Sequence, residues 1–262
     1  MSILNEIYNY KKEFVTQKKS KSDYLKIKEA ATNYTPKGFV KKIVKNNLNK
    51  KISIIGELKK ASPSAGTIFN DDQDYFNIAK IYEENGISCL SILTDEKYFK
   101  GNDNDLSEIR KYVSLPILRK DFIVDEYQLH ESKMLGADCI LIILAMIDEV
   151  KARELEDQAI KMGLDVLIEA HNMKEMEIAL DMKSDLVGIN NRNLNDFSVN
   201  INNSIDLTKN TSADKIIVSE SGIKTKNDID FIVLNSPIRT FLIGESLMRS
   251  LNIKEQIRTL LI

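Results

Sequence analysis

Glu57 and Lys59 are the residues of this sequence whose type and spacing point most directly to chemistry. They lie two positions apart in Ile-Gly-Glu-Leu-Lys at 55–59, where an apolar run ends. Residues two apart in a strand share a face, so both charges should face one side and Leu58 the other. A carboxylate and an ammonium group placed together hold each other ionised and offer a base and an acid to one substrate. The alternative interpretation is an exposed ion pair at a strand end.

Two further apolar runs also end in charged side chains. Lys120 has the strand parity of Leu118, so one of the three charges at 119–121 is expected to face inward. A solvated cluster of charges is the other interpretation of this segment. Glu169 is the last residue of the apolar run at 164–169, where burial could raise the pKa of its carboxyl group.

Three later segments carry groups suited to binding an anion. Asn190 and Arg192 share a strand face and supply an amide and a planar cation that suits a carboxylate or a phosphate. Ser-Glu-Ser-Gly at 219–222 and Gly-Glu-Ser at 244–246 are small-residue turns, each before a predicted helix. Glycine lets the backbone approach a ligand closely, and helix starts present free N–H groups. Each turn alone could be an ordinary helix cap, but together they predict a phosphate site.

Eight short apolar runs carry these polar residues at or just after their ends. Each run is followed by a segment that can form a helix, and strands that are apolar throughout are typical of a parallel sheet covered on both faces. This pattern predicts an α/β fold, a (β/α)8 TIM barrel, with its chemistry at the carboxyl ends of the strands. An open doubly wound sheet is the structural alternative. The runs are 52–58, 87–94, 115–119, 138–144, 164–169, 185–189, 215–219 and 238–243.

Residues 1–48 differ from the rest of the chain because they are rich in lysine and poor in glycine. Apolar residues at spacings of three and four, such as Ile3, Ile7 and Phe14, predict amphipathic helices with a break at 36–38. The lysines are expected on solvated helix faces, and a basic arm for an anionic partner is the alternative. We therefore predict one barrel domain over 1–262, of which 1–48 is an N-terminal helical extension.

Composition excludes several classes of protein. The chain has 37 basic and 39 acidic residues, a net charge of -2, so no overall field favours nucleic acid or a membrane surface. Cys89 and Cys139 lie in apolar runs and are interpreted as core residues in a reducing compartment. His130 and His171 are expected at helix starts or on the surface, and no cluster of ligands suggests a metal. The longest apolar run, 139–147, is too short to span a membrane, so a cytoplasmic location is expected.

These residues are together similar to those of a known family. The chain resembles the indole-3-glycerol-phosphate synthase family of tryptophan biosynthesis, in order from the first barrel strand to the last. The resemblance implies ring closure, decarboxylation and dehydration of 1-(2-carboxyphenylamino)-1-deoxyribulose 5-phosphate to indole-3-glycerol phosphate, without cofactor or metal. It also implies N-terminal helices that help to close the barrel mouth. The matching stretches are Glu-Leu-Lys-Lys-Ala-Ser-Pro-Ser at 57–64, Leu-Arg-Lys-Asp-Phe-Ile at 118–123, and 91–95, 167–169, 188–194, 219–223 and 242–248.

The resemblance implies a role for each charge at a strand end. Lys120 matches the acid that protonates the carbonyl oxygen during ring closure, and Lys59 matches the acid of the dehydration. Glu57 and Glu169 match carboxylates that act as base, orient the lysines or stabilise cationic intermediates. Their division of labour stays open at this point. Asn190 matches a position near the reacting hydroxyl groups.

The remaining matches form the substrate-binding set, in which Arg192 matches a position near the anthranilate carboxylate. Glu245 stands where some family members carry serine, and its carboxylate would repel a phosphate. We expect this side chain to turn away so that its backbone N–H serves, or Ser246 to supply a hydroxyl group instead. The set comprises Ser62, Phe122, Arg192, Ser221, Gly222, Gly244, Glu245 and Ser246.

Two other functions are alternatives. Phosphoribosylanthranilate isomerase, an enzyme of the same fold and pathway, would need a Cys/Asp pair at the ends of strand one and of strand five or six. Here Glu57 and Lys59 end strand one. A noncatalytic barrel that binds a phosphorylated ligand would make the strand-end charges dispensable. The expected partner is a small phosphorylated substrate, with no nucleic acid and no membrane, and the expected assembly is a monomer.

Overall fold

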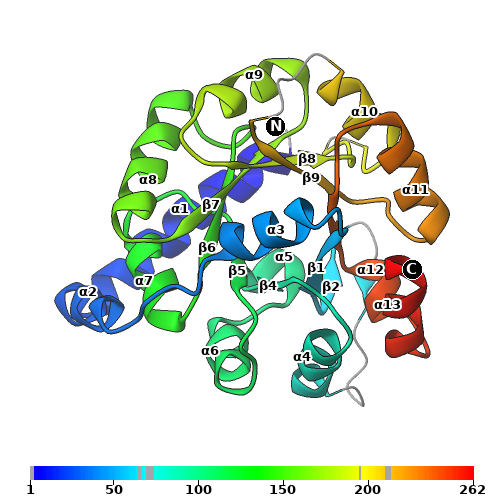
Figure 1. The fold of residues 1–262 in the computed structure, drawn as a ribbon. Coiled ribbons are helices and arrows are strands. Elements are labelled where there is room, and N and C mark those ends of the chain that lie inside the picture. Colours follow the sequence, from blue (N-terminus) through cyan, green and yellow to red (C-terminus); the bar gives the residue numbers. More distant parts are fainter. Residues whose placement is uncertain (1–2, 64–65, 69–73, 195, 210–213) are drawn as a thin grey trace.

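The computed structural model describes residues 3–63, 66–68, 74–194, 196–209 and 214–262. In these residues eight parallel strands form a closed barrel in the order β1-β10-β9-β8-β7-β6-β5-β4 (Figure 1). Each of the eight predicted apolar runs overlaps one of these strands, and four of the strands extend one residue past the run, so the barrel is confirmed and the open sheet is wrong. The strands are β1 (Ser53–Leu58), β4 (Cys89–Leu93), β5 (Ile117–Lys120), β6 (Cys139–Ile143), β7 (Asp165–Ala170), β8 (Leu186–Asn190), β9 (Ile216–Glu220) and β10 (Thr240–Ile243).

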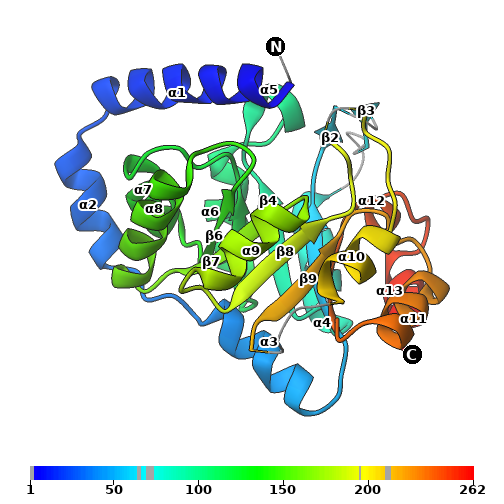
Figure 2. The same cartoon turned by 90° about the horizontal axis from the view of Figure 1, so that it is seen from above.

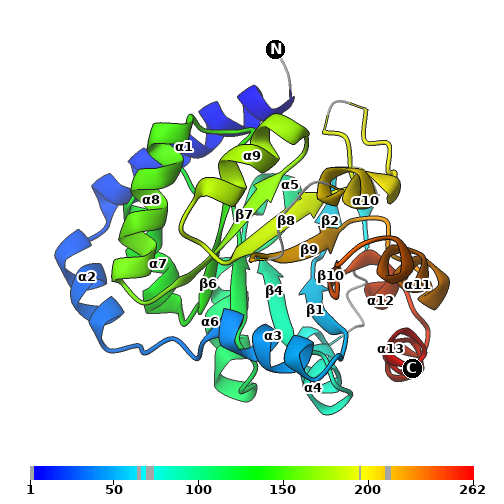
Figure 3. The same ribbon diagram turned by 45° about the horizontal axis from the view of Figure 1, so that its top comes forward.

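Helices surround the strands and cover their outer faces (Figure 3). Several of them begin where a side chain accepts a hydrogen bond from a backbone N–H of the first turn, as Asp74, Asp148 and Asn172 do. The helices after β1 are α4 (Tyr75–Glu84), α5 (Glu96–Phe99), α6 (Asp103–Tyr112), α7 (Tyr127–Leu135), α8 (Glu149–Lys161), α9 (Met173–Asp181), α10 (Asn202–Thr208), α11 (Lys226–Asn235), α12 (Glu245–Met248) and α13 (Ile253–Leu261).

Alternation along the strands separates an outer core from an inner one. On β1, Ile54 and Leu58 belong to the core between the barrel and its helices, while Ile55 belongs to the interior cluster. This confirms that Leu58 packs outward and leaves Glu57 on the inner face. Cys89 and Cys139 are free, buried and part of the interior cluster, which confirms them as core residues.

The N-terminal region forms α1 (Ile3–Lys21), α2 (Tyr24–Thr32) and α3 (Phe39–Leu48), which confirms the predicted helices and the break at 36–38. In Figure 2, α1 and α3 lie at opposite ends of the barrel. Phe39 and Ile43 of α3 are fully buried in the interior cluster. Ile3 and Ile7 of α1 line the cavity at the other end. Among the described helices, none is both long and apolar enough to span a membrane.

A short antiparallel hairpin, which the sequence did not predict, follows β1. It consists of β2 (Ala61–Ser62) and β3 (Gly66–Thr67), with Ala61 opposite Thr67. The hairpin carries Ser62 beside the barrel mouth. Ser64, which ends the matching stretch at 57–64, lies outside the described residues.

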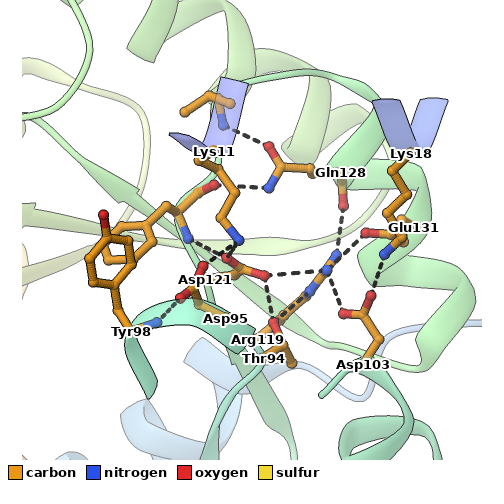
Figure 4. Close-up of polar contacts among 12 residues, drawn as sticks. Lys11, Lys18, Thr94, Asp95, Tyr98, Asp103, Arg119, Asp121, Gln128 and Glu131 are labelled. Carbon is orange, nitrogen blue, oxygen red and sulfur yellow. Dashed lines mark hydrogen bonds and ion pairs between the residues drawn. The ribbon is translucent and has the colours of Figure 1, made fainter. Parts of the chain in front are cut away.

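Helix α1 is fastened to the barrel by a buried ammonium group (Figure 4). The Nζ atom of Lys11 lies 2.8 Å from Asp95 Oδ2 and 2.6 Å from Asp121 Oδ1, and its side chain is 2% exposed. Burial alone would lower the pKa of this group, but the two carboxylates raise it above its ordinary value. The expectation that the N-terminal lysines lie on solvated faces is therefore wrong for Lys11, because two buried carboxylates need a cation.

The same network continues to Arg119 on β5. Its guanidinium group is buried and lies 2.6 Å from Asp103 Oδ1, 2.8 Å from Glu131 Oε2 and 3.4 Å from Asp121 Oδ2 (Figure 4). Arg119 therefore faces the surrounding helices. Because neighbouring residues of a strand face opposite sides, this contact fixes the inward direction of Lys120.

Lys11→Ala should destabilise the fold by about 3 kcal/mol, because it removes the cation that contacts the buried carboxylates of both Asp95 and Asp121. Urea and thermal unfolding of the variant measure this loss. Lys12→Ala is the matched control, since Lys12 is the exposed neighbour on the same helix. Equal stability of the two variants would contradict a structural role of Lys11.

Candidate active site

A cavity of about 960 Å³ opens at the carboxyl ends of the strands. Every residue that the sequence predicted for the site lies on its wall, so the structure brings the whole set together. These residues are Glu57, Lys59, Ser62, Lys120, Phe122, Glu169, Asn190, Arg192, Ser221, Gly222, Gly244, Glu245 and Ser246. Apolar residues of α1, including Ile3 and Ile7, line the same cavity. The mouth of the barrel and the N-terminal helix therefore enclose one space.

Glu57 and Lys59 form a close pair on the inner side of β1. Lys59 Nζ donates to Glu57 Oε2 at 2.6 Å. Burial alone would raise the pKa of the Glu57 carboxyl, but Lys59 and Lys120 lower it below its ordinary value. A side chain on Gly244 would place its Cβ 2.5 Å from Glu57 Oε2, so only glycine leaves room for this carboxylate. The exposed ion pair considered from the sequence is wrong, since Glu57 is 4% exposed.

Lys120 stands at the centre of the charged cluster. Its Nζ atom lies 2.9 Å from Glu220 Oε2, 3.7 Å from Glu169 Oε2 and 3.8 Å from Glu57 Oε1. Burial alone would lower the pKa of Lys120, but the surrounding carboxylates raise it well above its ordinary value. The group is therefore an ammonium ion at neutral pH and can act as an acid towards a bound substrate.

Glu220, at the end of β9, is a site residue that the sequence reasoning missed. Its side chain is buried, and burial together with Glu169 and Glu57 raises the pKa of its carboxyl to about 7 against the opposing effect of Lys120. A Cβ atom at Gly188 on the neighbouring strand would lie 2.1 Å from Glu220 Oε1. Strand parity was the available signal, because Val218 two residues earlier faces the barrel interior.

Glu169 is held from several sides at the end of β7. Its Oε1 atom accepts a hydrogen bond from Asn190 Nδ2 at 3.1 Å and lies 3.2 Å from His171 Nε2. Burial alone would raise the pKa of this carboxyl, but Lys120, His171 and Asn190 lower it to about 2. The sequence-based expectation that the Glu169 carboxyl has a raised pKa is therefore wrong, since the net shift is downward. Nearby positive charge outweighs desolvation here.

The two histidines differ from each other. His171 precedes α9, whose cap residue is Asn172, so its expected place at a helix start is confirmed. Its ring is however 12% exposed and contacts Glu169, so it is not a surface residue. His130 lies within α7 and its Nε2 is 3.6 Å from Glu126 Oε1. In the described residues, no group of three or more His, Cys, Asp or Glu side chains could hold a metal ion.

Asn190 links the charged cluster to the anion-binding side of the cavity. Its Oδ1 atom accepts hydrogen bonds from Ser221 Oγ at 2.9 Å and from the backbone N–H of Arg192 at 3.0 Å. The Arg192 guanidinium donates to the carbonyl oxygen of Phe197 at 3.0 Å. These contacts orient an amide and a cation on one wall, as the shared strand face predicted. Phe122 faces the same cavity from the segment after β5.

The turns after β9 and β10 lie next to each other. Ser221 and Gly222 have φ angles of 65° and 85°, a conformation that glycine favours. Ser246 Oγ donates to the carbonyl oxygen of Ile223 at 3.1 Å, so this hydroxyl joins the two turns. Glu245 Oε1 lies 3.2 Å from Arg249 Nε. The Glu245 carboxylate thus pairs with a cation of its own helix end, and both side chains line the cavity.

Comparison with known proteins assigns a family. The family model described as "Indole-3-glycerol phosphate synthase" matches residues 4–260. A protein of that name from Caldanaerobacter subterraneus subsp. tengcongensis is 44% identical over 248 residues, 94% of this chain and 93% of the relative. Its namesake from Zymomonas mobilis subsp. pomaceae is 42% identical over 262 residues, 99% of this chain and 98% of the relative.

Solved structures that are similar to this chain support the barrel fold and nothing more specific. The tryptophan synthase A-subunit from Pyrococcus furiosus has a TM-score of 0.59 at 15% identity, covering 80% of this chain and 98% of that one. Thiamine phosphate pyrophosphorylase from the same organism has a TM-score of 0.59 at 11% identity, covering 82% and 96%. At such low identities the likeness concerns the fold.

Glu220→Gln should stabilise the protein at pH 8 and have less effect at pH 5. The carboxyl pKa rises from 4.5 to about 7 on folding, so the folded state holds this proton more tightly. The stability that Glu220 contributes is therefore present below about pH 4.5 and is lost as the pH rises through about 7. Because one pKa unit corresponds to about 1.4 kcal/mol, the effect can reach a few kcal/mol.

Unfolding temperatures of wild type and Glu220→Gln between pH 5 and pH 8 measure this effect. The unfolding temperature of Glu220→Gln should rise relative to that of wild type as the pH increases. Glu177→Gln is the control, since Glu177 is exposed on α9. A difference that stays constant across the range would show that Glu220 does not titrate there.

Proposed function

The chain belongs to the indole-3-glycerol phosphate synthase family, and from this premise we propose how its own residues divide the chemistry. The enzyme is a carboxy-lyase of tryptophan biosynthesis that forms indole-3-glycerol phosphate from a small phosphorylated substrate. The observation that carries the proposal is the ammonium group of Lys120, which is only 15% exposed and faces the cavity among the carboxylates of Glu220, Glu169 and Glu57.

Lys120 serves the ring closure. In this step an aromatic carbon of the substrate attacks the ribulose carbonyl group, and negative charge develops on the carbonyl oxygen. A buried ammonium ion both stabilises that charge and donates the proton that neutralises it. The carboxylates around Lys120 keep it charged until the substrate oxygen arrives.

Lys59 serves the dehydration that follows loss of carbon dioxide. The departing hydroxyl group needs a proton, which Lys59 donates, and the hydrogen bond to Glu57 at 2.6 Å holds the ammonium group in place. Glu220 suits the removal of a proton from the ring system, because its pKa of about 7 allows it to take up and release protons near neutrality. Glu169 stays a carboxylate and stabilises the cationic intermediate.

The remaining residues hold the substrate. Arg192, oriented beside Asn190, suits the anthranilate carboxylate through its planar guanidinium group. Phe122 provides an apolar surface for the aromatic ring. The turns at 221–222 and 244–246 suit the phosphate through their backbone N–H groups and hydroxyl groups. The residues that form these turns are Ser221, Gly222, Gly244, Glu245 and Ser246, and Ser62, on the hairpin after β1, lines the same cavity.

The organisation around this reaction is part of the proposal. We propose that 1–262 is a single barrel domain whose first 48 residues form a helical extension, of which α1 lies over the mouth. A monomer in the cytoplasm is proposed with it, where the free thiols of Cys89 and Cys139 stay reduced. The near-neutral charge of -2 favours no interaction with nucleic acid.

Neither alternative function fits as well. Cys89 and Cys139 are the first residues of β4 and β6, at the end of the barrel away from the cavity, so an isomerase-like thiol is not at the mouth. A noncatalytic phosphate-binding barrel would not need four buried charges at its centre, because burying them is unfavourable without a compensating use.

Incubation with 1-(2-carboxyphenylamino)-1-deoxyribulose 5-phosphate should produce indole fluorescence in the presence of wild-type protein. Lys120→Ala should lower kcat by at least about a hundredfold, the scale of a lost general acid. Lys111→Ala, an exposed lysine on α6, is the control and should retain the full rate. Folded wild-type protein without an indole signal would overturn the proposed function, and an unchanged rate in Lys120→Ala would remove that lysine from its role.

Glu245 and Arg249 should act in opposite directions on phosphate binding. Glu245→Ser should lower KM and Arg249→Ala should raise it, each by a few-fold, because both side chains are partly exposed and are screened by salt. The double variant should return towards the wild-type KM. Steady-state kinetics at low and high ionic strength measure these changes. Identical KM values in all four proteins would show that this pair lies too far from the phosphate.

A further inference from the structure

The imidazole ring of His171 lies directly behind Glu169, and the proposed reaction gives it no role. His171 is the first residue after β7. Its Nε2 atom lies 3.2 Å from Glu169 Oε1, and its Nδ1 atom lies 3.2 Å from Glu175 Oε2. The ring is 12% exposed and therefore sits between a carboxylate of the cavity and a carboxylate of α9.

The outer carboxylate is itself held in place. The backbone N–H of His171 donates to Glu175 Oε2 at 2.8 Å. Asn172, the cap residue of α9, donates from its Nδ2 to Glu175 Oε1 at 2.6 Å and accepts from the Glu175 backbone N–H at 3.0 Å. Both oxygens of Glu175 are thus engaged. The start of the helix fixes the ring in its position behind Glu169.

Charged groups from each neighbouring element face this arrangement. Glu169 comes from β7 and Glu175 from α9, while Lys120 of β5 lies 3.7 Å from the other oxygen of Glu169. Arg192, after β8, lines the same polar cleft as His171. Burial alone would lower the pKa of the imidazole, but Glu169 and Glu175 raise it to about 10.

We propose that His171 is a positioning residue that acts as an imidazolium clamp, keeping Glu169 a carboxylate and aiming it at the reacting substrate. The inference rests on the proposed function and deepens it. Glu169 Oε1 is occupied by Asn190 and faces His171, which leaves Oε2 towards Lys120 and the cavity. Glu220 contacts Lys120 without a second cation behind it among the described residues. The clamp therefore separates two neighbouring carboxylates, one that stays charged and one that exchanges protons.

His171→Asn should make turnover sensitive to acid. Without the imidazolium ion, Glu169 takes up a proton at higher pH, so the ratio of variant to wild-type kcat should fall about fivefold or more between pH 8 and pH 5.5. KM should stay within about twofold, since the ring lies behind Glu169 and makes no substrate contact in this arrangement. Glu175→Gln should shift the ratio in the same direction by a smaller factor, and it serves as the second variant if His171→Asn does not fold.

His130→Asn is the matched control, because it removes the other histidine, which lies on α7 and contacts Glu126, the cap residue of that helix. Its kcat ratio to wild type should be the same at pH 8 and pH 5.5. A ratio for His171→Asn and Glu175→Gln that is also constant with pH would overturn the proposal.

Nuclear magnetic resonance of histidine-labelled full-length protein tests the charge directly. The chain contains two histidines, so His171→Asn assigns both imidazole signals. The signal of His171 should keep imidazolium chemical shifts from pH 6 to pH 9. The signal of His130 should titrate with a pKa below that of an ordinary histidine. A neutral His171 ring at pH 7 would overturn the clamp. Because this measurement needs no substrate, it separates failure of the clamp from failure of the proposed function.

Discussion

The ammonium group of Lys120 lies in the barrel mouth, largely shielded from solvent, among the carboxylates of Glu220, Glu169 and Glu57. An isolated charge in such a place would cost several kcal/mol, so each member of the cluster is tolerated because the others are present. The four residues come from β5, β9, β7 and β1. Closure of the barrel brings these strand ends around one axis, and the active site can form only when the fold is complete.

The strand that carries Lys120 also joins the site to the N-terminal extension. Arg119 and Lys120 are neighbours on β5, and they face opposite sides as the strand geometry requires. Arg119 is held by the carboxylates between the barrel and its helices, and Lys11 of α1 joins the same network through Asp121. A helix far away in sequence therefore helps to fix the direction of the central lysine.

The groups that surround each glutamate of the site, and not its residue type, determine its pKa and therefore its role. Glu169 is surrounded by Lys120, His171 and the amide of Asn190, and its carboxyl has a pKa of about 2. Glu220 is equally buried but shares Lys120 with the other carboxylates, and its pKa rises to about 7. Two identical side chains about one lysine thus favour different roles, one electrostatic and one in proton transfer.

Local patterns in the sequence determined the barrel strands, the N-terminal helices and the inward direction of Glu57 and Lys59. These features depend on apolar periodicity and strand parity, which act between residues close in the chain. Only the tertiary structure placed Lys11 in the core and brought Glu220 to Lys120. Such contacts join residues up to 110 positions apart, as Lys11 and Asp121 show. A charged side chain can be buried only when an oppositely charged group lies beside it in the folded structure. A sequence pattern does not show which distant residue supplies that group.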